Sequence, residues 1–65
     1  MCLSTVYKNT KTPETVVMKN VMALECRDGM VILTDLMDRT CAIEGSLEMA
    51  NLVDGFVIVR EAAAN

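Results

Sequence analysis

The amino-acid sequence predicts a small all-β protein, and three observations lead to this prediction. Val, Ile and Thr, which favour strands, make up 17 of the 65 residues and occur in short runs. Turn-forming pairs separate these runs, above all Asp28-Gly29 and Asp54-Gly55. A chain of this length has room for one core. We therefore expect residues 1–65 to form a single small β-barrel domain.

The first half of the chain contains four of the seven short strands that we predict. A strand at 3–7 is followed by a polar loop at 8–13 and by a second strand at 15–18, its expected partner. Lys19 and Asn20 mark a bend. The strands at 21–26 and 30–36 are joined across Asp28-Gly29, because this pair readily adopts the positive φ values of a tight hairpin turn.

The second half of the chain contains the other three strands. The strand at 40–43 is expected to end at Glu44-Gly45, after which Ser46 caps a single helical turn. Strands at 49–53 and 56–60 form a second hairpin around Asp54-Gly55. The tail EAAAN, residues 61–65, is expected to fray or to form a brief helical appendage.

Six to seven short antiparallel strands of this kind are best closed on themselves, because closure leaves no sheet edge open to aggregation. An SH3-like barrel is the usual solution at this length. Within the strand at 30–36, alternation places Val31, Leu33 and Asp35 on one face and the other residues on the opposite face. In the last strand, Val57 and Val59 share one side.

The composition favours a homodimer. Apolar residues make up 52% of the chain and charged residues 23%, which is a rich apolar content for a lone 65-residue domain. The strands at 30–36 and 56–60 are apolar on both faces, including Ile32 and Ile58, so a barrel would leave apolar surface for a second copy to cover.

Charge and residue types exclude several classes of function. Nine acidic against six basic residues give a net charge of −3, which argues against nucleic-acid binding. Histidine is absent, and with it the commonest general base, so we do not expect an enzyme. No signal peptide and no apolar run of about 20 residues is present, so we expect a cytoplasmic protein that does not contact a membrane.

Cys2 is the candidate metal ligand. An initiator methionine before a small residue is commonly removed, and removal would leave a cysteine with a free α-amine. Amine nitrogen and thiolate sulfur close a five-membered ring with a metal, and two chain starts meeting across a two-fold axis would offer two nitrogens and two sulfurs. This donor set suits square-planar nickel(II). If Met1 is retained, the deprotonated amide nitrogen of Cys2 must serve instead. The residues alone leave open that Cys2 is an ordinary small apolar residue of the first strand.

Other candidate ligands are interpreted as structural. Cys26 and Cys41 are expected to be buried core thiols without a metal role. Four carboxylates are interpreted as a solvated acidic rim, since they lack the spacing of an oxygen-rich metal site: Asp35, Asp38, Glu44 and Glu48. Five methionines are assigned to core or interface packing: Met18, Met22, Met30, Met37 and Met49.

The sequence resembles the CooT-type family of small nickel-binding accessory proteins over nearly its whole length. The resemblance lies in the opening MCLSTVY, the Asp28-Gly29 hairpin, the turn at 43–45 and the final LVDGFVIV at 52–59. The MC start is its specific element. It implies cytoplasmic homodimers of SH3-like barrels, associated with nickel delivery for carbon monoxide dehydrogenase maturation. Nickel would be held through the cysteine after the initiator methionine, a position that Cys2 occupies here.

We therefore predict a homodimeric metallochaperone that binds one Ni(II) through Cys2 of each chain and serves a client nickel enzyme. The alternative is a small barrel that binds protein or RNA through its surface, with no metal role for Cys2.

Overall fold

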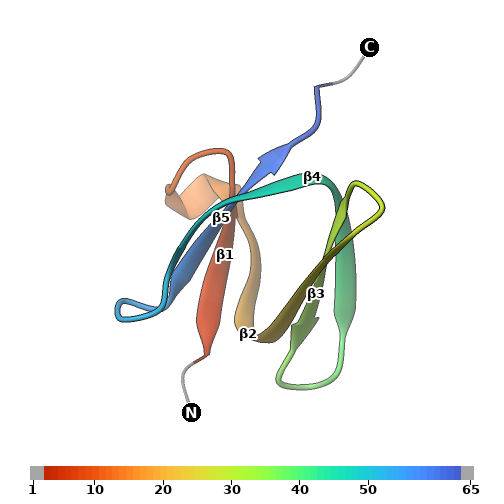
Figure 1. The fold of residues 1–65 in the computed structure, drawn as a ribbon. Helices are drawn as coiled ribbons and strands as arrows, with labels where there is room; N and C mark the ends of the chain where they lie inside the picture. Colours follow the sequence, from red (N-terminus) through yellow and green to blue (C-terminus); the bar gives the residue numbers. More distant parts are fainter. Residues whose placement is uncertain (1–2, 64–65) are drawn as a thin grey trace.

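The computed structural model describes residues 3–63, which fold into five strands closed into one barrel (Figure 1). The predicted all-β fold class and the closed barrel are confirmed. Each strand pairs with the next along the chain, and β5 returns to β1. The elements are β1 (Ser4–Lys8), the 3₁₀ helix η1 (Pro13–Thr15), β2 (Val16–Arg27), β3 (Met30–Asp35), β4 (Thr40–Asn51) and β5 (Phe56–Glu61).

β2 is one continuous strand of 12 residues, where the sequence analysis predicted two strands and a bend. Its first part pairs with β1 and its second part with β3, and the change of partner falls at Val21. Asn20, just before it, has a φ of 56°. The register of both ladders shifts around this point. Lys19 and Asn20 thus bend the strand without ending it, because a bulge changes strand direction while pairing continues on either side.

β4 also has 12 residues and changes partner in its middle. Glu44 is the last residue to pair with β3, opposite Met30, and Gly45 is the first to pair with β5, opposite Glu61. The predicted strand end at 44–45 and the helical turn capped by Ser46 are therefore wrong. Gly45 instead marks a corner of the barrel, where glycine allows a sharp bend. The two long strands explain why residues 3–63 contain five strands and not six or seven.

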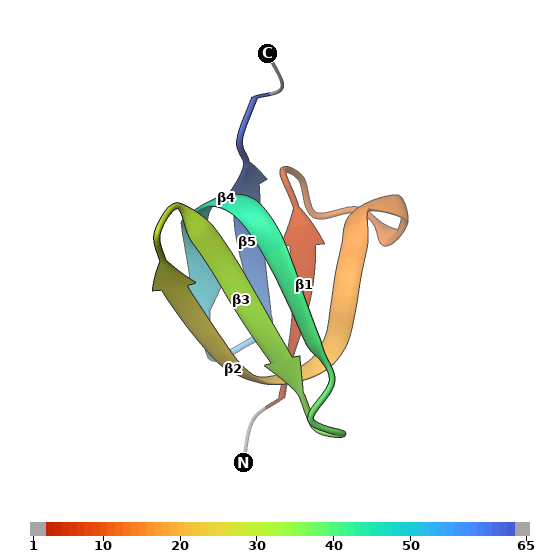
Figure 2. The same ribbon diagram turned by 90° about the vertical axis from the view of Figure 1, so that its right-hand side faces the viewer.

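The barrel closes through a parallel pair, which corrects the prediction that all strands are antiparallel. In a closed chain of successive antiparallel neighbours, an odd number of strands makes the first and last run in the same direction. β1 and β5 accordingly pair in parallel, from Thr5 opposite Phe56 to Lys8 opposite Val59. The start of β1 and the end of β5 therefore lie at opposite ends of the barrel (Figures 1 and 2).

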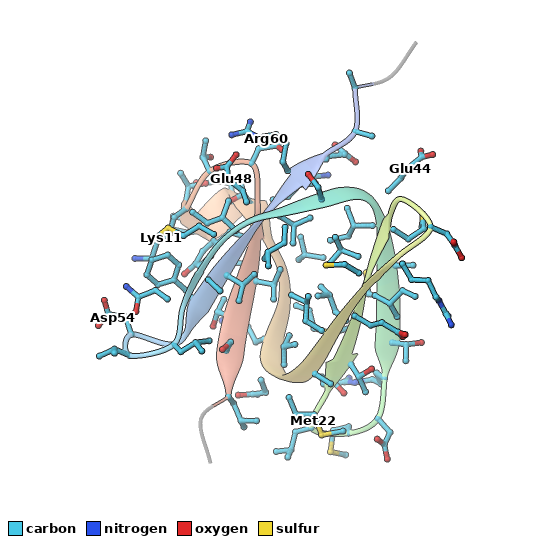
Figure 3. All side chains as sticks on the ribbon, viewed as in Figure 1. Lys11, Met22, Glu44, Glu48, Asp54 and Arg60 are labelled. Carbon is cyan, nitrogen blue, oxygen red and sulfur yellow. The ribbon has the colours of Figure 1, made fainter. Side chains whose placement is uncertain are left out.

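The core consists of branched aliphatic side chains that point into the barrel (Figure 3). The predicted alternation is confirmed: Val31 and Leu33 on β3, and Val57 and Val59 on β5, are buried. Burying each such side chain stabilises the fold by about 1.5–3 kcal/mol. The buried apolar residues are Val6, Val21, Val31, Leu33, Ile43, Val57 and Val59.

The two Asp-Gly hairpins differ. Asp28 and Gly29 both have positive φ, 53° and 75°, and form the predicted two-residue turn between β2 and β3. The turn between β4 and β5 spans residues 52–55, and of its Asp-Gly pair Gly55 alone has positive φ. Here the backbone N–H of Asp54 donates to the side-chain oxygen of Asn51 at 2.9 Å. The second turn is held by an asparagine that the sequence analysis did not single out.

Asp35 is buried on the core side of β3 and organises the turn that follows it. Its Oδ1 accepts hydrogen bonds from the backbone N–H groups of Met37 and Arg39, both at 2.9 Å, and its Oδ2 accepts one from Arg39 Nε at 2.8 Å. Desolvation raises the pKa of Asp35, but these donors and the guanidinium charge outweigh it and hold the pKa below its ordinary value. Asp35 therefore stabilises the β3–β4 turn from a buried position, and the prediction that it belongs to a solvated acidic rim is wrong.

Candidate functional site

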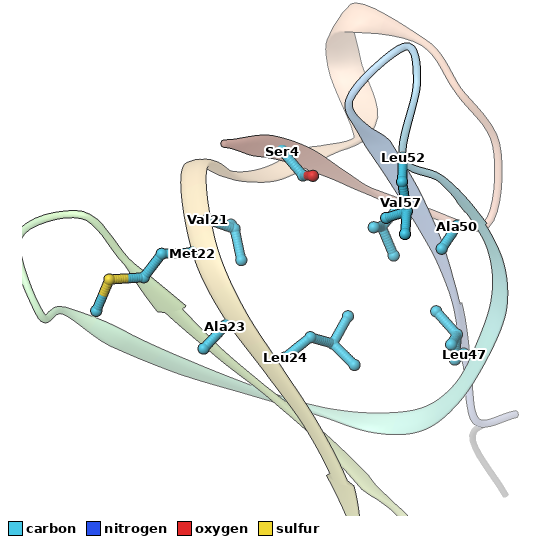
Figure 4. Close-up of a pocket in the computed structure, with 9 residues that line it drawn as sticks. All are labelled: Ser4, Val21, Met22, Ala23, Leu24, Leu47, Ala50, Leu52 and Val57. Carbon is cyan, nitrogen blue, oxygen red and sulfur yellow. The ribbon is translucent and has the colours of Figure 1, made fainter. Parts of the chain in front are cut away.

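An apolar pocket of about 260 Å³ opens on the side of the barrel, and Ser4 at the start of β1 is among the residues that line it. It lies between the second part of β2 and the second part of β4, two segments that are not hydrogen-bonded neighbours. Leu24 and Leu47 face it from opposite sides, and Ser4 and Leu52 lie at its rim (Figure 4). The full lining is Ser4, Val21, Met22, Ala23, Leu24, Leu47, Ala50, Leu52 and Val57. Ser4 is the one polar side chain among these residues.

Exposed aliphatic side chains continue from this pocket onto the two nearby turns. Leu52 and Val53 in the β4–β5 turn are 71% and 95% exposed, and Met37 in the β3–β4 turn is 72% exposed. Both turns lie toward the end of the barrel where β1 starts, as does Met22 (Figures 1 and 3). The remaining large exposed side chains are Leu36, Leu47 and Met49. We call this surface, made of the pocket and the two turns, the apolar end.

The apolar end is not the surface that alternation predicted. The sequence analysis assigned excess apolar area to the outer faces of two strands, including Ile32 and Ile58. Both of these side chains are half-buried in the monomer. The strongly exposed apolar side chains instead belong to β2, β4 and the turns, because the bends in the two long strands open a gap that the monomer does not fill. Contiguous exposed apolar surface on a small protein marks an interaction site.

Cys26 and Cys41 are both free thiols, but their surroundings differ. Cys26 is exposed, so the prediction that it is a buried core thiol is wrong. It lies near the tip of the β2–β3 hairpin, where residues 25–29 are all exposed, whichever face of the hairpin their side chains are on. Cys41 on β4 packs against the core, as predicted, but it is half-buried and not one of the buried core residues.

Residues 1–60 match the family model of CooT, described as the CO dehydrogenase accessory protein CooT. The chain belongs to the CooT family. The match includes the opening Met1-Cys2 and all five strands apart from the last residue of β5. Its family therefore gives this CooT chain an accessory role in the CO dehydrogenase system. No curated protein matches the chain.

The predicted metal ligand, Cys2, lies outside the described residues of this CooT chain. Within residues 3–63, no three His, Cys, Asp or Glu side chains are grouped so that they could hold a metal ion. Glu48, one of the four carboxylates considered from the sequence, accepts a hydrogen bond from Arg60 Nε at 2.7 Å.

The same part of the chain has no helix that is both long and apolar enough to cross a membrane.

Proposed function

We propose that this CooT family protein is a nickel(II)-binding homodimer that acts as an accessory protein, or metallochaperone, for a client nickel enzyme of the CO dehydrogenase system. Nickel is the cargo, held at the dimer interface through Cys2 of each chain, in a cytoplasmic protein that is not itself an enzyme. The observation that carries the proposal is the family match, which begins at Met1 and includes Cys2.

The donor chemistry of Cys2 fits nickel. One thiolate and one nitrogen from each chain make a set of two sulfurs and two nitrogens, which suits the square-planar geometry of Ni(II). A free thiol has a pKa of about 8.5, so binding expels a proton and nickel affinity rises with pH.

The position of Ser4 connects the proposed site to the apolar end. An extended chain spans at most about 3.6 Å per residue, so the Cα of Cys2 is no more than about 7 Å from the Cα of Ser4. Ser4 lines the apolar pocket. Pairing two copies through their apolar ends would therefore bring both Cys2 residues to one interface, with the two-fold symmetry that a shared metal requires.

A dimer interface of ordinary size would take up a moderate share of the surface of this small chain. A stable interface buries about 800 Å² on each partner. The total accessible area of the chain is 4479 Å². An interface of this size would therefore cover less than a fifth of the surface of each copy. The pocket lining contains no charged side chain whose burial would oppose association.

Nickel titration of single cysteine variants tests the proposal. Cys2→Ser should remove the nickel–thiolate charge-transfer band and lower nickel affinity more than about 100-fold, beyond what loss of a supporting group costs. Cys26→Ser and Cys41→Ser are matched controls, because each removes one thiol elsewhere, and both should keep the band. If Cys2→Ser binds nickel as the unmodified chain does, the metal role of Cys2 is refuted and the alternative of a partner-binding barrel gains support.

Native mass spectrometry of the same samples measures the assembly. We expect a mass of two chains with one nickel, and the mass of each chain reports whether Met1 has been removed. Two nickel ions per dimer, or one nickel on a monomer, would contradict the shared site.

A further inference from the structure

A second concave surface lies on the outer side of β1, beside the loop that carries η1. This cleft has a volume of about 590 Å³, and its lining includes Thr5, Tyr7, Lys11, Thr12, Pro13 and Lys19. Thr5 and Tyr7 point away from the core, since Val6 between them is fully buried. The cleft shares no lining residue with the apolar end, which lies around Ser4. We call it the lysine cleft.

The lysine cleft is lined by Lys11 and Lys19, the two basic residues that form no ion pair with a carboxylate in the described part of the chain. Each of the other four basic residues has a carboxylate oxygen within 4 Å. These pairs are Lys8–Glu61, Arg27–Glu25, Arg39–Asp35 and Arg60–Glu48. Lys11 and Lys19 form no such pair among residues 3–63, and no carboxylate side chain lines the cleft. Glu14 lies on the same loop but is not part of the lining. A protein of net charge −3 thus keeps a local positive surface here.

Tyr7, which lines the lysine cleft, contacts Phe56, the other aromatic residue of the protein. Tyr7 and Phe56 pack edge to face, with ring centroids 6.4 Å apart and planes at 78°. The Lys11 ammonium sits 4.7 Å from the centroid of the Phe56 ring. A cation over an aromatic face is attracted to it, so the Phe56 ring fixes the position of Lys11, one of the residues that line the cleft (Figure 3). The cleft therefore combines positive charge with apolar surface.

The loop that forms one wall of the cleft is fixed by its own hydrogen bonds. The Asn9 backbone N–H donates to the Val59 carbonyl at 2.8 Å, and the Asn9 side-chain oxygen accepts from the Glu61 N–H at 2.9 Å. The Thr15 hydroxyl accepts from the Thr12 N–H at 3.2 Å and donates to the Thr10 carbonyl. A preformed wall lowers the ordering cost of binding.

We propose that the lysine cleft is a docking site for an acidic peptide segment of a partner protein, a segment that carries carboxylates together with an aliphatic side chain. The carboxylates pair with Lys11 and Lys19, and the aliphatic group packs on Tyr7 and Pro13. Charge complementarity selects this occupant over nucleic acid, because two unpaired lysines on an acidic protein cannot neutralise a phosphate backbone. The site goes beyond nickel binding and does not depend on Cys2.

Nuclear magnetic resonance titration of the full chain tests this docking site. The probe is a synthetic eight-residue peptide of Glu, Asp and Leu, compared with the same peptide in which Gln and Asn replace Glu and Asp. We expect the acidic peptide to shift the backbone amide signals of Tyr7, Lys11, Thr12 and Lys19, and the neutral peptide to bind at least about fivefold more weakly. Raising the salt concentration should weaken the acidic peptide alone.

Two double variants separate a local site from general attraction. Lys11→Gln with Lys19→Gln should lower the affinity for the acidic peptide at least about fivefold. Arg27→Gln with Arg60→Gln removes the same amount of charge elsewhere and should change the affinity less than twofold. Equal weakening in both variants, equal binding of the neutral peptide, or tighter binding of a single-stranded RNA at these amides would overturn the proposal. The titration is repeated with nickel-free Cys2→Ser protein. Because the docking site does not depend on Cys2, the same affinity for the acidic peptide is expected there.

Discussion

Replacing Gly45 by alanine tests whether the corner in β4 holds the barrel together. Gly45 lies where β4 leaves β3 and joins β5, with a φ of 156°. A Cβ atom added there would overlap the carbonyl oxygen of Arg60 and lie 3.0 Å from the Cα of Glu61. Both obstacles belong to the backbone of β5, so no side-chain rotation can relieve the overlap.

The expected loss of stability follows from three terms. Overpacking costs about 1–3 kcal/mol, and a strained positive φ costs about 1–3 kcal/mol. The lower entropy of the unfolded alanine chain returns about 0.4–1 kcal/mol. We therefore expect Gly45→Ala to lower the free energy of unfolding by about 1–6 kcal/mol. A domain of this size has about 3–10 kcal/mol in total, so the variant loses a large share of its stability or does not fold.

Urea unfolding followed by circular dichroism measures this loss, at one fixed protein concentration because the proposed dimer would also add stability. Gly29→Ala is the matched control. Gly29 has a φ of 75°, but a Cβ added there meets no atom within 4 Å, so its expected loss is the backbone strain of about 1 kcal/mol. Equal losses in the two variants would refute the steric argument for Gly45.

The remaining predictions concern Asp35 and the thiols. Because the pKa of Asp35 is lowered in the folded state, its carboxylate stabilises the fold above the unfolded pKa of about 3.9, and this contribution is lost as the pH falls through the lower folded pKa. Asp35→Asn should show a smaller drop in urea midpoint between pH 5 and pH 2, and an unchanged drop would contradict the role of Asp35. In the Cys2→Ser background, a thiol reagent should modify exposed Cys26 faster than half-buried Cys41, and the opposite order would contradict their placement.

Much of the barrel could be predicted from the sequence, because period-two alternation and tight-turn residues are local properties. The buried side chains of β3 and β5 and the Asp28-Gly29 turn follow directly from them. Strand number could not be obtained in this way. Asn20 and Gly45 have the residue types of strand ends, and only the partners on either side show that they bend a continuous strand. Likewise, Asp35 has the composition of a surface acid, and its burial depends on donors that the β3–β4 turn brings to it.

The candidate sites were less accessible to sequence reasoning. Cys2 was singled out by its place after Met1 and by family resemblance, and the apolar end was not foreseen. Alternation within one strand cannot show that β2 and β4 diverge and leave Leu24 and Leu47 facing an open pocket. The lysine cleft was missed for a similar reason: which of the six basic residues finds a carboxylate is decided by contacts between distant segments, such as Lys8 with Glu61. The unpaired lysines could not be recognised before those contacts were known.

The parallel pairing of β1 with β5 has a practical consequence for handling the protein. Since these strands run in the same direction, an affinity tag or a surface linker that follows β5 in the chain would leave the barrel at the end away from Ser4. A tag placed ahead of β1 would instead stand on the side of Ser4, which lines the apolar pocket. Purification and immobilisation through a tag that follows β5 would therefore leave the surface around Ser4 accessible.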